Sequence, residues 1–335
     1  MRAFLCHSFC DAEDLKVEET PAPKISEGNV RIAIKAAGVN FADTLIIKGK
    51  YQVRPPFPFA PGLEIAGEIT EVAAGVNGFK IGDRVMAMTG YGGFATETVT
   101  AEENLIQIPE KMDYVTAAGF PSVYGTSHIG LAHKLKLQTN ETILIHGAAG
   151  GVGLSAVQIS KKLGATVIAT AGGTEKLKVV KTYGADHLIN YQTDDIRERV
   201  KQLTNGRGVD AVYDPVGGNA FDATLRCTAQ RGRILVVGFA SGTIPQIPAN
   251  IILVKNITVI GYYWGAHRKL DPNLIRSSFD ELIRWYNAGD LKPHVSKTFD
   301  LENAAKAMKM LINRKSTGKV VLTMSPPNQL RSKTH

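Results

Sequence analysis

Residues 143–164, ILIHGAAGGVGLSAVQISKKLG, are the stretch that decides the fold. The stretch begins with an apolar run at 143–145, which predicts a buried strand. A loop of small residues follows at 147–151, and apolar side chains then recur at helical spacing until Gly164, which stands at the position of a C-cap. Strand, glycine turn and helix form a dinucleotide-binding unit, because glycines let a pyrophosphate approach the N–H groups and positive dipole of the helix start. The stretch therefore predicts a cofactor site at Ala148, Ala149, Gly150, Gly151 and Val152.

The glycine pattern departs from the usual G-x-G-x-x-G at one position. Its three places hold Ala148, Gly150 and Gly153. A tight strand-to-helix turn in another kind of α/β protein is the alternative interpretation. We favour dinucleotide binding because the turn lies between a strand and a helix and precedes a second apolar strand at 165–170.

The composition is that of a globular protein with room for two domains: 335 residues, 44% hydrophobic and 21% charged. No apolar run approaches the ~18 residues of a membrane span, and the N-terminus lacks the long apolar segment of a signal peptide. Three cysteines provide no paired disulfide framework, so we expect a cytoplasmic protein. The net charge of +8 is spread along the chain, which favours a surface that attracts a polyanionic cofactor over one that binds nucleic acid.

Two kinds of pattern divide the chain. Residues 1–122 contain short β-like runs separated by Gly and Pro, which predicts a small β-barrel-like domain. In 123–262 six apolar strands alternate with helical segments, which predicts an α/β domain with a doubly wound parallel sheet. The alternation then stops, and the count of elements predicts that 263–335 returns to complete the first domain. In such a fold we expect the reaction in the inter-domain cleft, outside the carboxyl ends of the parallel strands.

Several motifs, in order along the chain, carry a family resemblance: GVNFAD at 38–43, GKY at 49–51, PGLEIAG at 61–67, GFKIGDRV at 78–85, AAGGVG at 148–153 and DPVGG at 214–218. The chain resembles the medium-chain dehydrogenase/reductase superfamily and, within it, the zinc-free quinone oxidoreductase (zeta-crystallin-like) branch. The resemblance implies a GroES-like β-barrel catalytic domain joined to a Rossmann domain with a six-stranded parallel sheet. It also implies a homodimer and a hydride-transferring activity.

Metal binding is where this branch differs from the alcohol dehydrogenases. There, a cysteine in the first motif and a histidine before the Glu of the PGLEIAG motif hold catalytic zinc. Asn40 and Leu63 occupy these positions here, and neither is a good zinc ligand. No cysteine lies between Cys10 and Cys227 to build a structural zinc site. We therefore expect no metal site.

Without zinc ligands, hydride transfer to a quinone or an enone is favoured over alcohol oxidation. Alcohol oxidation proceeds through an alkoxide that must be stabilised, and a metal ion commonly does so. A quinone or an enone accepts hydride more easily, because it delocalises the charge onto oxygen, and the protein needs only to position it and donate a hydrogen bond or proton. The resemblance implies that Asn40, Asp43 and Tyr51 position the acceptor and donate the hydrogen bond or proton, at the substrate end of the nicotinamide pocket. Each also has a simpler interpretation: Asn40 holds a turn, Asp43 caps a helix, and Tyr51 is a rim aromatic.

The resemblance implies further cofactor contacts. Phe239 and Ala240 would pass under the nicotinamide ribose, and Tyr263 and Trp264 would line the nicotinamide beside the dimer interface. Lys319, at the last strand, would also contact the cofactor. The simpler alternatives are turn formation for the loop, core packing for the aromatic residues and, for Lys319, an exposed charge near the C-terminus.

NADPH is the expected cofactor. An acid that binds the adenine ribose diol of NADH is expected about 20 residues past the glycine motif, and Gly172 stands there. Gly172 and Gly173 leave room for a 2′-phosphate, Lys176 lies within reach of it, and Tyr191 matches a family position whose hydroxyl contacts it. Two alternatives are that Glu175 binds a diol and that Lys176 pairs with a neighbour.

Three functions remain in competition. The first is an NADPH-dependent quinone oxidoreductase, and the second is an NADPH-dependent reductase of carbon–carbon double bonds in alkenals and enones. The third is an NADPH-binding protein of low turnover with a structural or RNA-binding role. A basic groove with interleaved aromatics would favour the third, and the sequence has no such interleaving.

Overall fold

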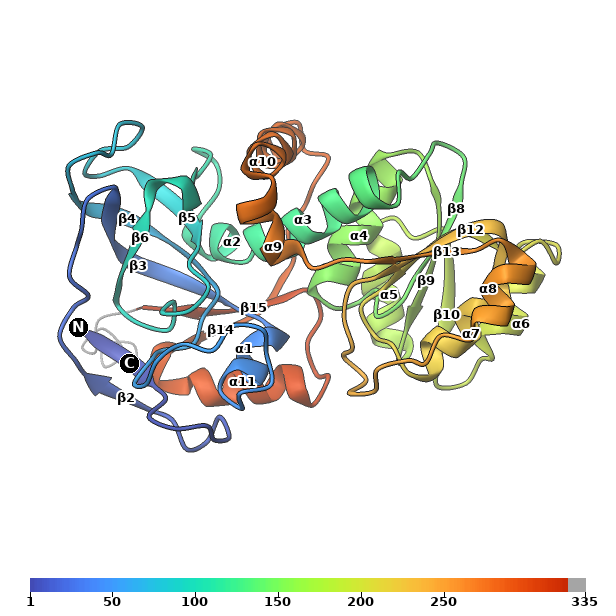
Figure 1. The fold of residues 1–335 in the computed structure, drawn as a ribbon, viewed down its shortest axis with the longest axis horizontal. Helices are drawn as coiled ribbons and strands as arrows, with labels where there is room; N and C mark the ends of the chain where they lie inside the picture. Colours follow the sequence, from blue (N-terminus) through green and yellow to red (C-terminus); the bar gives the residue numbers. More distant parts are fainter. Residues whose placement is uncertain (325–335) are drawn as a thin grey trace, which may run out of the picture. The chain divides into compact units, whose positions relative to one another are not determined.

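The computed structural model describes residues 1–324. Contacts within the chain divide it into two units: unit 1 contains Met1–Ser122 and the described residues from Pro293 to Met324, and unit 2 contains Val123–Lys292 (Figure 1). Among residues 1–324, no helix combines the length and the apolar character needed to cross a membrane.

Unit 1 is built on a sheet whose strands follow the order β14-β15-β3-β4-β5-β7, with β6 also paired to β3. Its long strand β3 (Asn29–Val39) buries Val30, Ile32 and Ile34 at the two-residue spacing of a strand with one face in the core. Its other elements are β1 (Arg2–Leu5), β2 (Lys16–Glu19), α1 (Phe41–Ile46), β4 (Glu64–Val72), β5 (Arg84–Met88), β6 (Glu97–Ala101), β7 (Leu105–Gln107) and α2 (Tyr114–Ala118). This arrangement is the predicted GroES-like domain.

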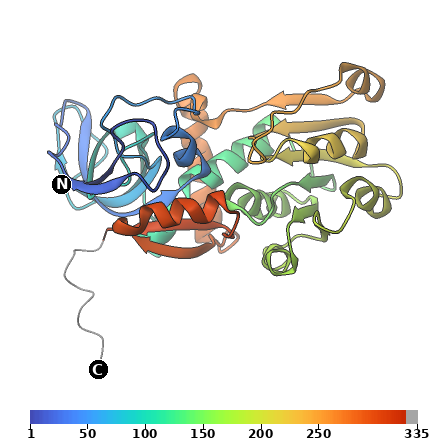
Figure 2. The ribbon, with the colours of Figure 1, turned by 90° about the horizontal axis from the view of Figure 1, so that it is seen from below.

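The end of the described chain completes unit 1. Strand β15 (Lys319–Thr323) pairs antiparallel with β3, which places Val320 opposite Val39. Strand β14 (Val295–Asp300) pairs parallel with β15, and α11 (Ala304–Ile312) lies along these two strands (Figure 2). This pairing brings Lys319 next to the end of β3, close to Asn40.

Unit 2 contains the predicted six-stranded parallel sheet, in the order β10-β9-β8-β11-β12-β13. Helices cover both faces of this doubly wound sheet (Figure 1). The strands are β8 (Thr142–Ile145), β9 (Thr166–Ala171), β10 (His187–Asn190), β11 (Val209–Asp214), β12 (Thr228–Val236) and β13 (Thr258–Gly261). The crossover helices are α4 (Gly151–Lys162), α5 (Thr174–Thr182), α6 (Ile196–Leu203), α7 (Asn219–Cys227) and α8 (Ala249–Lys255).

The second boundary between the units differs from the predicted one, because residues 263–292 group with unit 2. This segment contains α9 (Trp264–Leu270) and α10 (Pro272–Asn287), whose aromatic side chains pack on α3 (Pro121–His128). A Cβ at Gly125 would lie 2.9 Å from the Trp264 ring and 3.1 Å from the Phe279 ring. The helical periodicity of α10 was visible in the sequence, but its packing partner was not.

Candidate functional site

The glycine turn of unit 2 leads directly into α4. Gly150 is the N-cap residue of this helix, and no side chain caps the first N–H groups. A Cβ at Gly150 would meet a single neighbour, the Gly147 carbonyl oxygen at 3.4 Å, so open space surrounds it. A Cβ at Gly153 would instead collide with that same oxygen, which makes Gly153 a packing glycine. The unsatisfied N–H groups and the helix dipole make this turn suitable for an anion.

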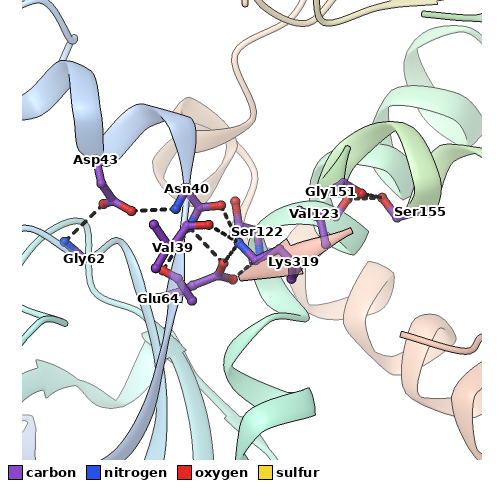
Figure 3. A network of polar contacts seen from close by, with 11 residues as sticks. Val39, Asn40, Asp43, Gly62, Glu64, Ser122, Val123, Gly151, Ser155 and Lys319 are labelled. Atoms are coloured by element: carbon purple, nitrogen blue, oxygen red, sulfur yellow. Dashed lines mark hydrogen bonds and ion pairs between the residues drawn. The ribbon is translucent and has the colours of Figure 1, made fainter. Parts of the chain in front are cut away.

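The predicted turn residues lie together, and hydrogen bonds to neighbouring parts of unit 2 hold them in place. Ala148 is buried and its N–H donates to the Thr170 carbonyl of β9 (2.9 Å). Gly151 and Val152 form the first turn of α4. The Ser155 hydroxyl lies within hydrogen-bond distance of the carbonyl oxygens of Val123 (3.0 Å) and Gly151 (3.2 Å) (Figure 3). It also lies 3.1 Å from the Val152 carbonyl oxygen. The carbonyl groups of this turn are thus held by the protein, while its N–H groups are left for a ligand.

The end of β9 brings together the residues predicted to meet a 2′-phosphate. Gly172 lies against Tyr191, because a Cβ at Gly172 would be 2.6 Å from the Tyr191 hydroxyl oxygen. Gly173 is the N-cap of α5 with a φ of 88°, and its N–H donates to Asn190 (3.1 Å). Lys176 lies in the first turn of α5. The Glu175 carboxylate pairs with Lys178 (2.7 Å) on the solvent side of that turn.

Two further loops are joined through Asp214 at the end of β11. One Asp214 carboxylate oxygen accepts hydrogen bonds from the N–H groups of Val216 (2.8 Å) and Gly217 (3.0 Å). The Pro215 carbonyl accepts from Ala240 (3.0 Å), and Phe239 is exposed beside Gly217. The other Asp214 oxygen is buried without a hydrogen-bond partner within residues 1–324. The Asp214 carbonyl oxygen accepts from the Val237 N–H (2.9 Å), so Asp214 fixes the loop that carries Phe239 and Ala240 as well, a role not predicted from the sequence.

The two aromatic residues after β13 differ in environment. Tyr263 is exposed at the N-cap of α9. Trp264 is buried, packed against Gly125 and edge-to-face with Phe279 at 6.4 Å between ring centroids. The structure therefore favours the core alternative for Trp264, and we keep only Tyr263 as a candidate contact.

Unit 1 gathers the half-buried Asn40 and the buried Glu64 and Lys319 into one polar network (Figure 3). Lys319 Nζ donates to Glu64 Oε1 (2.7 Å), to Asn40 Oδ1 (2.8 Å) and to the Val39 carbonyl (2.9 Å). Asn40 Nδ2 donates to Glu64 Oε1 (2.9 Å), and the Ser122 N–H donates to Glu64 Oε2 (2.8 Å). The network fixes the orientation of the Asn40 amide, since its oxygen faces the cation and its nitrogen faces the carboxylate.

The family resemblance implied that Lys319 contacts the cofactor, whereas its ammonium group is directed to Glu64 and Asn40. Glu64 was quoted only as part of a motif. Its burial, with 0% of its surface exposed, is the feature that makes a partner obligatory. No signal in the sequence joins residue 64 to residue 319, because β15 reaches β3 only through the fold.

Asp43 is also buried, and it acts as a helix cap. Its carboxylate accepts hydrogen bonds from the N–H groups of Asn40 (2.7 Å) and Gly62 (3.1 Å). Burial raises the pKa of the Asp43 carboxyl to about 7, while both backbone donors and the Lys319 charge act in the opposite direction. Because both oxygens are used within unit 1, we leave Asp43 out of the substrate-contacting residues. Tyr51 lies half-buried in the loop after α1.

The positions that hold catalytic zinc in related branches carry a different set of side chains. Leu63 is a buried apolar residue, and Asn40 is engaged by Lys319 and Glu64. Throughout the part of the chain that the structure describes, no group of three or more His, Cys, Asp or Glu side chains is arranged to hold a metal ion.

Comparison with known proteins gives matches over both units. A family profile described as "Alcohol dehydrogenase GroES-like domain" matches residues 26–110, and one described as "Zinc-binding dehydrogenase" matches residues 151–287. The quinone oxidoreductase-like protein 2 homolog of Nematostella vectensis is 42% identical over 96% of this chain and 88% of the relative. The quinone oxidoreductase of Pseudomonas aeruginosa is 35% identical over 90% of this chain and 92% of its own.

Solved structures agree with this relationship. The quinone oxidoreductase of Escherichia coli, complexed with NADPH, superimposes with a TM-score of 0.90 at 29% identity. The alignment covers 97% of this chain and 100% of that protein.

Proposed function

The chain belongs to the zinc-free quinone oxidoreductase branch of the medium-chain dehydrogenase/reductase superfamily, and on that premise we propose that it is an NADPH:quinone oxidoreductase. The family makes it an oxidoreductase that uses a nicotinamide cofactor. The quinone as acceptor and the preference for NADPH are our proposals.

The observation that carries the proposal is the uncapped start of α4 behind Gly150. Its N–H groups have no side-chain acceptor, and the space around Gly150 is open. A pyrophosphate supplies the negative charge and the acceptor oxygens that such a helix start lacks. The residues present therefore fit a dinucleotide, with Ala148, Ala149, Gly151 and Val152 forming the rest of the cradle.

The choice of NADPH is supported by the residues after β9. The Glu175 carboxylate, which could bind a ribose diol, is paired with Lys178 instead. Gly172 lies against the Tyr191 hydroxyl, and Lys176 lies in the first turn of α5. A 2′-phosphate would find a hydroxyl donor and an ammonium group here.

The reduction itself requires little from the protein. When bound, NADPH supplies the hydride. In our proposal Phe239, Ala240 and Tyr263 position the nicotinamide, and Asn40 and Tyr51 position the acceptor. The Lys319 ammonium, 2.8 Å from Asn40 Oδ1, polarises the amide and stabilises negative charge that develops on an acceptor oxygen. Glu64 balances this cation, so the pair can remain buried when no acceptor is present.

The proposal is tested by following NADPH absorbance with 1,4-benzoquinone and with a panel of alkenals and enones, each against a buffer control. We expect turnover of the quinone with a kcat/KM above that of every alkenal, unchanged by EDTA. A higher kcat/KM for alkenals or enones would establish the second candidate, double-bond reduction. Salt-dependent RNA binding that NADPH displaces, without turnover of either class, would establish the third.

A further inference from the structure

Unit 1 carries a row of aromatic rings on its surface. Phe9, Phe57 and Tyr91 are 48%, 42% and 42% exposed, and the buried Phe59 joins them. Phe9 meets Phe57 edge-to-face at 5.0 Å between centroids, Phe57 lies 5.5 Å from Phe59, and Phe59 meets Tyr91 edge-to-face at 6.5 Å. Single exposed aromatics are ordinary, whereas a continuous row is a feature of binding surfaces.

Backbone hydrogen bonds hold the row in place. Phe59 and Cys6 exchange N–H···O bonds in both directions (2.8 and 3.1 Å), which fixes the segment that carries Phe9. The Gly92 N–H donates to the Ala60 carbonyl (2.7 Å), which fixes the segment that carries Tyr91. The rings are thus presented by a rigid frame, so a ligand would not have to order it.

The row is connected to the proposed acceptor residue Asn40 through α1 and the turn that follows this helix. Phe9 packs on Gly49, where a Cβ would lie 2.8 Å from its ring. Gly49 closely follows α1, the helix that begins directly after Asn40. The six residues of α1 give it a length of about 9 Å, which separates Asn40 from the end of the helix. At the other end, Gly62 donates to Asp43 in the same helix (3.1 Å). A molecule with a head at Asn40 and a chain of this length or longer could therefore reach the rings.

The row is uncharged, and its polar group is the Tyr91 hydroxyl. The three segments that carry its rings, 8–10, 55–59 and 90–94, contain no charged residue. Basic residues lie only beside these segments, at Arg54 and at Lys48 and Lys50 on either side of Gly49, and Lys48 is paired with Asp11. The row is also one ring wide, which suits a chain better than a second protein, whose contact would need a broad patch.

We propose that Phe9, Phe57, Phe59 and Tyr91 form a binding site for the apolar tail of a lipophilic quinone whose head group is reduced beside Asn40. This inference rests on the proposed function and adds the class of acceptor, a quinone with a long hydrocarbon side chain. Burial of the tail against the rings lowers KM, because the tail contacts are the same in the ground state and the transition state.

The experiment compares 2,3-dimethoxy-5-methyl-1,4-benzoquinone with its 6-decyl derivative. The measured quantity is the ratio of kcat/KM for the decyl quinone to that for the tail-less one. We expect a ratio of about ten or more in the wild type, the size expected when roughly two methylene groups are buried. The ratio should fall about tenfold in Phe57→Ala and Tyr91→Ala and be largely restored in Phe57→Leu. Leu270→Ala, which truncates an exposed leucine of unit 2, is the matched control and should keep the wild-type ratio.

Direct binding separates this inference from the proposed function. Isothermal calorimetry with the two quinones measures the affinity ratio even if neither is turned over. Absence of turnover with both would refute the proposed function, whereas equal affinities in the wild type, or a ratio unaffected by Phe57→Ala and Tyr91→Ala, would overturn the tail site. If those variants instead lose binding to phosphatidylcholine vesicles while the quinone ratio persists, the row is a membrane contact and the inference is wrong.

Discussion

Lys176 and Lys178 lie two residues apart in α5 and offer a matched test of cofactor choice. Lys178 pairs with Glu175 at the surface, whereas Lys176 is the residue that we assign to the 2′-phosphate. We expect Lys176→Ala to weaken NADPH binding by roughly ten- to a hundredfold, the value of a charge-assisted contact of about 1.5–3 kcal/mol. NADH binding should be unchanged, and Lys178→Ala should affect neither cofactor. Dissociation constants for both cofactors check this. Equal weakening of NADPH and NADH by Lys176→Ala would remove Lys176 from the phosphate site.

The Lys319–Glu64 pair makes a prediction about stability. Lys319→Met leaves the Glu64 carboxylate buried without its cation, so we expect the free energy of unfolding to drop by about 3–5 kcal/mol. Adding Glu64→Gln removes the stranded charge and keeps an oxygen for the Ser122 N–H, so the double variant should recover most of that loss. Urea unfolding of the single and double variants measures the coupling. If the losses in the free energy of unfolding of the two single variants simply add in the double variant, Lys319 and Glu64 do not interact directly.

At the scale of elements, the start of α4 contains one glycine that we assign to ligand binding, Gly150, and one that serves packing, Gly153. Gly150 has a φ of −79°, which any residue adopts, and open space around its Cβ position. Gly150→Val should therefore fold normally and bind NADPH at least about tenfold more weakly, because its side chain occupies the space that the pyrophosphate needs. Gly153→Ala should instead destabilise the protein by about 1–3 kcal/mol, because its methyl group meets the Gly147 carbonyl. Thermal unfolding and cofactor titration of both variants test the contrast. Unaltered NADPH affinity in Gly150→Val would place the cofactor elsewhere.

The contact between α3 and α10 makes stability depend on pH. His128 is buried there, with Nδ1 hydrogen bonded to Ser278 (2.8 Å) and Nε2 3.2 Å from Glu281 without an aligned hydrogen bond. The other groups facing it are His133 and Trp285. Burial lowers the pKa of His128 to about 4, against the opposing effect of the Glu281 charge. The unfolded chain therefore takes up the proton first as the pH falls.

It follows that the free energy of unfolding should decrease as the pH falls from about 6.5 to about 4, by up to roughly 3 kcal/mol from this group. His128→Gln should flatten that slope, and His133→Gln, at an exposed neighbour, should retain it. Urea unfolding at a series of pH values measures the slopes. A wild-type slope that persists in His128→Gln would assign the effect to other groups.

The elements show why the sequence predicts some features and not others. The strands and helices of 142–262 follow from hydrophobic period and glycine position, which are local properties, and the parallel sheet follows from their alternation. The placement of α9 and α10 in unit 2 depends on Trp264 and Phe279 finding α3, which no local pattern records. The Glu64–Lys319 pair is likewise a product of the antiparallel pairing of β15 with β3. In the same way, Asp43 is recognisable as a cap from sequence, but its burial is a tertiary property.

At the scale of the whole molecule, the edge of the unit 2 sheet bears on assembly. Strand β13 is the last strand of that sheet, and it contains no charged residue to protect its free edge. Leu253 and Val254, in the helix α8 that precedes it, are 76% and 68% exposed, and Ile244 is exposed before them. An unprotected edge beside exposed apolar side chains favours association with an identical copy.

We therefore expect a homodimer that uses β13 and α8, in agreement with the expectation from the family resemblance. Light scattering after gel filtration should give twice the chain mass of 36.1 kDa. Leu253→Glu combined with Val254→Glu should shift the protein toward the monomer, because two charges would be buried without partners in the contact. Leu270→Glu, a charge placed on an equally exposed leucine of α9, should leave the mass at the dimer value. Either a monomeric wild type or a double variant that stays dimeric would show that this surface is not the interface.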